Sequence, residues 1–256
     1  MTEFFASPYT IAVLFLLIAF IYSSVGLGGG SAYTALMAIL GFGTLVIPMI
    51  SLSLNVLVTL VGSINYIRHK HARLNLILPF LLTSIPLAYL GGALQLDKQT
   101  FYWVLLVSLC FVAARIYLWQ DMRMELKLSA TAKLVVALAA GTVLGFVAGV
   151  AGIGGGIYLV PLIIILGLGT QKEAAASGVI FIFINSISGI VSRFQYNMVD
   201  LANYIPLFGA VLVGGALGSY FGAAHYSAKK MEKILGLIIL SAIVLLGRKL
   251  IISAVA

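Results

Sequence analysis

The 256-residue chain has the composition of a membrane protein. Hydrophobic residues make up 62% of it, against about half in soluble domains, and charged residues 9%, against about a quarter. The net charge is +8, but the basic residues gather in short loops between apolar segments, where orientation signals of membrane proteins collect. This composition leaves little chain for a soluble domain and argues against nucleic-acid binding.

Apolar runs bounded by glycine, proline or charge predict two series of five helical elements. The first series covers residues 8–25, 31–42, 45–68, 74–94 and 98–119, and the second covers 134–150, 156–168, 172–192, 203–223 and 231–252. The first element follows Glu3 rather than a positively charged leader, and no small-residue cleavage site follows it, so we expect it to be retained. The predicted fold is an all-α polytopic membrane protein, multi-pass in the cell inner membrane.

Two stretches of the chain match each other. Gly26 to Thr44, GLGGGSAYTALMAILGFGT, aligns with Gly152 to Thr170, GIGGGIYLVPLIIILGLGT, at one constant offset. An Asn, a Pro and a Gly-Gly-Ala-Leu sequence then follow in the same order in both halves. We therefore predict two homologous transmembrane repeats, residues 1–120 and 134–256, joined by a polar cytoplasmic linker at 121–133.

The repeats have either opposite or equal orientation in the membrane. If the short second element of each repeat spans the membrane, the repeats are inverted; if it dips in and returns, they are parallel. With the basic segment from Arg68 to Arg73 set inside, the inverted arrangement places one more lysine or arginine inside than the parallel one. Inverted repeats are also frequent in secondary transporters, so we favour them, with the N-terminus outside.

Each repeat carries three consecutive glycines, Gly28–Gly30 and Gly154–Gly156, inside an apolar run. Glycine in a helix interior costs about 1 kcal/mol relative to alanine, and irregular backbone facing lipid leaves polar groups unsatisfied, so these tracts predict breaks that face protein or water. A break exposes successive N–H groups beside a helix N-terminus, and together they attract an anion. We expect the two broken short helices to meet near the membrane midplane and bind substrate there. The alternative is that the glycines only permit close helix packing.

The candidate substrate-binding residues lie in these tracts or shortly after them. They are Gly28, Gly29, Gly30, Ser31, Asn55, Gly154, Gly155, Gly156 and Asn185. An amide in lipid needs a partner, so the two asparagines either donate to an anion or bond to a neighbouring helix. Ser31 either donates to the anion or to nearby backbone. Farther along the chain, Lys172 and Glu173 are expected to form an ion pair with each other in a loop.

This combination resembles the sulfite exporter TauE/SafE family of membrane anion transporters. The resemblance covers nearly the whole chain and rests on the two Gly-x-Gly-Gly-Gly motifs that begin at Gly26 and Gly152, the duplicated layout and the basic central loop. The first copy departs from the family pattern at Ala35, where the second copy has Pro161. The resemblance implies export of sulfite, sulfonates or related small sulfur-containing anions. We expect this transport to proceed by alternating access and without a cofactor.

The remaining reactive residues argue against an enzyme and a metal site. All seven carboxylates fall in loops or at helix ends, away from the mid-span position expected of a coupling acid. The three histidines lack zinc-like spacing, and the single Cys110 is expected to be a small core hydrophobe. The other hypotheses that we keep are uptake of a sulfur compound, transport of another small organic anion, an intramembrane enzyme and a membrane scaffold. The sequence leaves a homodimer open.

Overall fold

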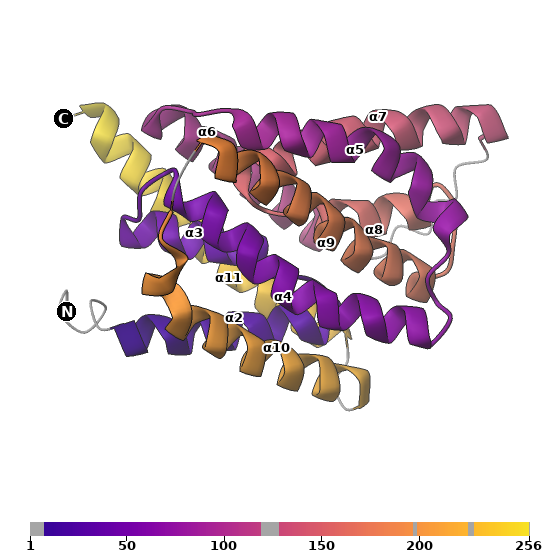
Figure 1. Cartoon of the computed structure of the whole chain (residues 1–256), viewed down its shortest axis with the longest axis horizontal. Coiled ribbons are helices and arrows are strands. Elements are labelled where there is room, and N and C mark those ends of the chain that lie inside the picture. Colours follow the sequence, from indigo (N-terminus) through magenta and orange to yellow (C-terminus); the bar gives the residue numbers. More distant parts are fainter. Residues whose placement is uncertain (1–7, 119–127, 197–198, 225–227, 256) are drawn as a thin grey trace.

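The computed structural model describes residues 8–118, 128–196, 199–224 and 228–255, and these residues form helices and connecting turns without a strand (Figure 1). The helices are α2 (Pro8–Ser24), α3 (Gly30–Leu40), α4 (Val46–Arg68), α5 (Leu74–Ala93), α6 (Lys98–Leu118), α7 (Ala130–Ala151), α8 (Gly156–Ile165), α9 (Gln171–Tyr196), the 3₁₀ turn η1 (Leu201–Tyr204), α10 (Ile205–Ala224) and α11 (Ala228–Val255). Among the described helices, seven are long and apolar enough to cross a membrane, while α3 and α8 have 11 and 10 residues. The predicted all-α multi-pass fold is confirmed.

Helix α7 begins earlier than the sequence predicts. The Ser129 hydroxyl accepts a hydrogen bond from the Ala132 N–H at 3.2 Å and so caps the helix start. Residues 130–133, expected at the end of the linker, are therefore helical. The part of the expected linker from 121 to 127 lies outside the described residues.

The most extensively packed helix pairs each join one helix from the first half of the chain to one from the second. They are α5 with α7 and α2 with α10. On α7, Gly141 and Gly145 lie one turn apart, and a Cβ added to either would collide with the backbone carbonyl of Phe80 or Ser84 on α5. Small residues at this spacing let membrane helices approach until their backbones touch.

The α2–α10 pair uses the same device. Gly214 and Gly218 on α10 lie one turn apart and face the backbone carbonyls of Leu16 and Phe20 on α2. The two long helices α4 and α9 also pack against each other, as do α6 and α11. This set of pairs stays the same when each helix is exchanged for its counterpart in the other half, which supports our proposal of an internal repeat.

Figure 1 also bears on the orientation of the halves. Helix α4 runs toward the right of the view and α9 toward the left, and the α4–α5 connection and the end of α10 lie toward the right with the starts of α7, α9 and α11. The start of α2 and the end of α11 lie on the left. The basic segments at 68–73, 172 and 229–233 thus lie toward one end, as in the inverted arrangement that we propose. Because α2 and α4 begin at the same end, the short α3 brings the chain back to that end, as the inverted arrangement requires of the second element.

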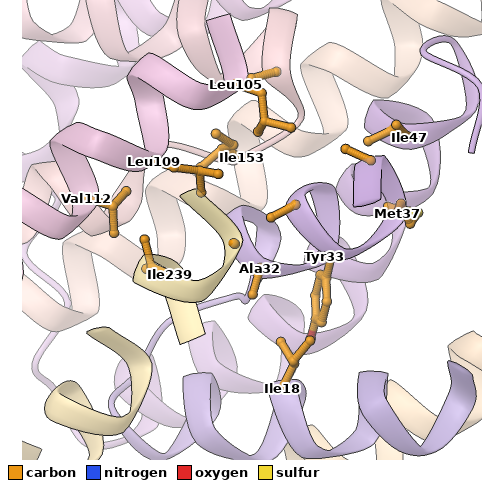
Figure 2. Close-up of a cluster of buried hydrophobic side chains, with 14 of the residues drawn as sticks. Ile18, Ala32, Tyr33, Met37, Ile47, Leu105, Leu109, Val112, Ile153 and Ile239 are labelled. Carbon is orange, nitrogen blue, oxygen red and sulfur yellow. The ribbon is translucent and has the colours of Figure 1, made fainter. Parts of the chain in front are cut away.

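The short helix α3 lies inside the bundle rather than against lipid. Figure 2 shows Ala32, Tyr33 and Met37 of α3 among apolar side chains of neighbouring helices, including Ile18 of α2 and Leu109 of α6. These side chains are buried, so the broken start of α3 is shielded from lipid on all sides. The sequence-based expectation for Cys110 was wrong, because this residue is exposed on the outer surface of α6.

Cysteine labelling tests the inverted orientation. In a Cys110→Ser background we expect an impermeant maleimide applied to intact cells to label Ala202→Cys but not His69→Cys. Both side chains are exposed, and the two positions lie in corresponding loops of the proposed repeats. Labelling of both positions, or of neither, would contradict inversion, and labelling after permeabilisation controls for reactivity.

Candidate functional site

The two glycine breaks meet in the interior of the protein, at a contact that we call the glycine crossing or simply the crossing. Gly29 and Gly155 stand directly before α3 and α8 and have positive φ angles of 93° and 74°, a conformation that glycine adopts without a Cβ penalty. A Cβ added at Gly30 would lie 2.6 Å from the backbone carbonyl oxygen of Ile153, so there is no space between the breaks for a side chain. Ile153 itself lies beside α3 and α6 side chains in Figure 2. The prediction that the broken helices meet is thus supported by direct contact.

Ser51 on α4 joins the breaks. Its hydroxyl donates to the Gly152 carbonyl oxygen at 2.7 Å and lies 3.2 Å from the Gly30 carbonyl oxygen. Sequence reasoning did not single out Ser51 and missed this contact. The signal was present, because Ser51 and Ser177 are separated by the same offset as the two glycine tracts.

Asn55, one helical turn after Ser51, touches both breaks. Its Oδ1 lies 2.7 Å from the position of a Cβ at Gly28, and its Nδ2 lies 2.5 Å and 3.1 Å from the corresponding positions at Gly30 and Gly154. The side chain is fully buried, yet neither amide atom has a hydrogen-bond partner. Buried polar groups are nearly always hydrogen-bonded, and an exception indicates a functional role or an absent ligand.

The backbone adds further free donors around Asn55. Among the described residues, the N–H groups of residues 28–31 and 154–157 donate no hydrogen bond, and the first N–H groups that do belong to Ala32 and Tyr158. Free N–H groups carry the positive end of a helix dipole, roughly half an elementary charge for each helix. The N-termini of α3 and α8 therefore give this region a positive potential.

Ser31 and Asn185 behave differently from Asn55. The Ser31 hydroxyl lies 2.7 Å from the Tyr22 hydroxyl, a partner that the sequence did not suggest. Asn185 donates from Nδ2 to the Phe181 carbonyl oxygen of its own helix at 2.9 Å, and its Oδ1 has no partner. Asn185 is not among the atoms nearest to any glycine of either tract; Phe181 takes that place beside Gly155, with Cε1 3.0 Å from the Cβ position. The two halves thus line the crossing with different chemistry.

The carboxylates of the described residues lie away from the crossing. Asp97 lies in the connection after α5, Asp200 directly precedes η1, and Glu173 lies at the start of α9. The expected pair between Lys172 and Glu173 was wrong, because Glu173 pairs with Arg73 at 3.2 Å and accepts a hydrogen bond from the Thr170 N–H. No group of three metal-ligating side chains occurs in the described part of the chain. No acid among the described side chains therefore neutralises the positive potential at the crossing.

The crossing is closed to both sides in this structure. All residues of both glycine tracts are buried, as are Ser31, Ser51 and Asn55. Asn55 and Ile182 lie near the middle of the long helices α4 and α9, and Ile182 contacts the Cβ positions of Gly28 and Gly154. The candidate site is a sealed, positively polarised region halfway along the helices.

Comparison with known proteins decides the family. The model of the family described as sulfite exporter TauE/SafE matches residues 11–250 of the chain. The chain belongs to the TauE/SafE family. A similar member, the probable membrane transporter protein y4hK of Sinorhizobium fredii, is 32% identical over 239 residues, which cover 90% of this chain and 94% of y4hK.

A second similar protein, the probable membrane transporter protein YunE of Bacillus subtilis, is 32% identical over 120 residues, 47% of this chain and 42% of YunE. No solved structure matches the chain. Together with the membrane-spanning helices, these relatives identify this TauE/SafE protein as a multi-pass membrane transporter. Their printed names specify neither cargo nor direction.

Two substitutions separate structural from ligand-binding roles within this TauE/SafE site. We expect Ser51→Ala to lower stability by about 1–3 kcal/mol, because it leaves buried carbonyls without a donor. Asn55→Leu should leave stability unchanged or raise it, because it removes two buried polar atoms that have no partner. Thermal unfolding in detergent measures both. A larger loss for Asn55→Leu than for Ser51→Ala would show that Asn55 has a structural partner.

Proposed function

We propose that this protein exports small sulfur-containing anions, sulfite or sulfonates, by alternating access. The observation that supports the proposal most directly is the buried Asn55 amide, which touches glycines of both breaks and has no partner. A buried unsatisfied polar group costs about 1–3 kcal/mol, and a bound oxyanion would accept from Nδ2. The protonated form of sulfite could also donate to Oδ1.

The preference for an anion has an electrostatic basis. Free N–H groups at two helix N-termini and the Asn55 Nδ2 offer donors around one point, and the described carboxylates lie elsewhere. A helix N-terminus favours negative charge and disfavours positive charge. The same positively polarised groups would repel a cation at the crossing.

The sealed site requires a change of shape to admit and release its substrate. Helix α2 packs with α10, and α5 packs with α7 and α9, so the closely packed groups combine both halves of the chain. We propose that these interlocked groups rock against each other, with α4 and α9 at their contact. The sequence halves themselves are not the moving bodies in this scheme.

Membrane potential can drive export without a coupling acid. Moving one negative charge out of a cell with a negative interior gains about 2.3 kcal/mol per 100 mV. The described carboxylates lie at helix ends or in turns, where a proton- or sodium-coupling role inside the membrane is not expected. Uniport of an anion is the simplest mechanism compatible with this distribution.

The closest alternative keeps the same site and changes cargo or direction: uptake of a sulfur compound, or transport of another small organic anion. Competition among sulfite, methanesulfonate and acetate in a flux assay distinguishes these cargoes. A sulfonate and a carboxylate differ in the number of acceptor oxygens that can reach the converging donors. Stronger competition by acetate than by methanesulfonate would favour the alternative.

A single methyl group should block the crossing. We expect Gly30→Ala to reduce sulfite or methanesulfonate flux in liposomes at least about tenfold, because the added Cβ would lie 2.5 Å from Asn55 Nδ2 and 2.6 Å from the Ile153 carbonyl oxygen. Gly41→Ala, at the other end of α3, is the matched control, since its Cβ meets nothing within 4 Å.

The control is demanding, because Gly41 has a φ of 85° and its substitution adds backbone strain without filling space. If folded Gly30→Ala and Gly41→Ala proteins transport equally well, the glycine crossing is not the substrate path. Folding of each variant is checked by size-exclusion chromatography in detergent.

Uniport makes a second prediction. In liposomes clamped with potassium and valinomycin, an inside-negative potential of 100 mV should shift the equilibrium distribution of methanesulfonate outward by about 50-fold. The distribution is measured with labelled methanesulfonate. A distribution that ignores the potential would indicate electroneutral exchange or proton-linked transport instead.

A further inference from the structure

Arg193, near the end of α9, is a buried cation that the glycine crossing does not explain. Its side chain is 2% exposed. Nη2 donates to the backbone carbonyl oxygens of Gly149 and Val150, at 2.7 Å and 3.0 Å, while Nε has no partner. A guanidinium carries five N–H donors and keeps its charge, so these two bonds leave it incompletely satisfied.

No acid neutralises this charge within the described residues. The ion pair found there joins Arg73 and Glu173. These two residues lie at the starts of α5 and α9, whereas Arg193 lies near the end of α9. The two carbonyls belong to the last turn of α7, whose negative dipole end offsets part of the charge. Burying an uncompensated charge costs free energy, so a bound anion would stabilise this site.

A small pocket opens beside Arg193. Its lining includes Thr44 and Pro48 from the turn before α4 and its first residues, Val150 from α7, and the apolar side chains Leu45, Leu94, Leu96 and Phe101. It lies among the α3–α4 and α5–α6 connections, at the end of the molecule away from the basic segments. In this sealed conformation it has room for about one water molecule, so a larger occupant requires the helices to separate.

The pocket is continuous with the glycine crossing along one face of α4. Pro48 lines the pocket and also touches the Cβ position of Gly152. Ser51 and Asn55 follow Pro48 on the same side of the helix, at three and seven residues. The carbonyl acceptors of Arg193 lie just before the second break, so Arg193 is attached to the backbone that leads into the crossing.

We propose that Arg193 and Thr44 form a second anion site, at which the exported anion is held on the outer side before release. This inference rests on the proposed function and names its exit site. The ligand class is a small oxyanion or sulfonate, because the guanidinium keeps its charge and its unpartnered Nε–H can donate to one oxygen of such a group. The Thr44 hydroxyl supplies a further donor, and the apolar lining accommodates a short alkyl group.

The competing interpretation is that Arg193 only caps the C-terminus of α7. A cap affects stability alone, whereas an anion site affects the concentration of external anion needed for transport. The test measures exchange of labelled methanesulfonate in liposomes with anion varied separately on each side, together with the thermal shift that methanesulfonate produces in detergent. Arg248→Gln is the matched control, because Arg248 is exposed near the same end of the molecule.

We expect Arg193→Gln to raise the half-saturating external concentration at least about tenfold, to change the internal value less than about twofold, and to reduce the thermal shift. Arg193→Lys should fall between Arg193→Gln and wild type, and Arg248→Gln should match wild type. If Arg193→Gln does not fold, Thr44→Val replaces it, with an expected increase of about threefold in the external value alone.

An unchanged half-saturating external concentration in folded Arg193→Gln, or in Thr44→Val where that variant is used, would overturn the exit site. The proposed function would still stand in that case, because the wild type transports the anion. An equal change on both sides would also overturn it, because the effect would then not belong to the outer pocket. Absence of both flux and thermal shift in the wild type would overturn the proposed function, and the exit site with it.

Discussion

The structure depends on one constraint: a backbone group that leaves the helical hydrogen-bond ladder inside a bilayer needs protein around it. Both glycine breaks interrupt the helical hydrogen-bond pattern, and both are buried at the centre of the bundle. Helix α3 is surrounded by α2, α4, α6 and α11, and α8 lies against α9. The long helices therefore enclose a short stretch of non-helical backbone, and that stretch supplies the donors of the candidate site.

Glycine performs two different tasks in this enclosure. On α7 and α10 it lets whole helices touch backbone to backbone, as Gly141 and Gly214 do. At Gly29 and Gly155 it allows a positive φ and turns the chain into a new helix start. The packing explanation thus holds for the glycines of α7 and α10, while the anion-binding role that we propose concerns the glycines of the breaks. Free N–H groups distinguish the second task from the first.

The sequence was sufficient for the helices, the family and the two breaks, because hydropathy and glycine placement are local signals. It did not reveal that Ser51 holds the breaks together or that Glu173 pairs with Arg73, since those contacts join residues far apart in the chain. The sequence also did not reveal that Cys110 is exposed, for a different reason. In lipid an apolar residue is equally suited to the core and to the outer surface, so hydropathy carries no inside–outside information.

The interlocking of α2 with α10 has a consequence for how the protein is made. Helix α2 leaves the ribosome long before α10, which carries the glycine face that α2 packs against. Until α10 is inserted, one side of α2 must be covered by lipid or by an insertion factor. The first half of the chain therefore cannot reach its final structure alone, and on our proposal of an internal repeat an ancestor consisting of one repeat would have had to exchange helices with a second copy.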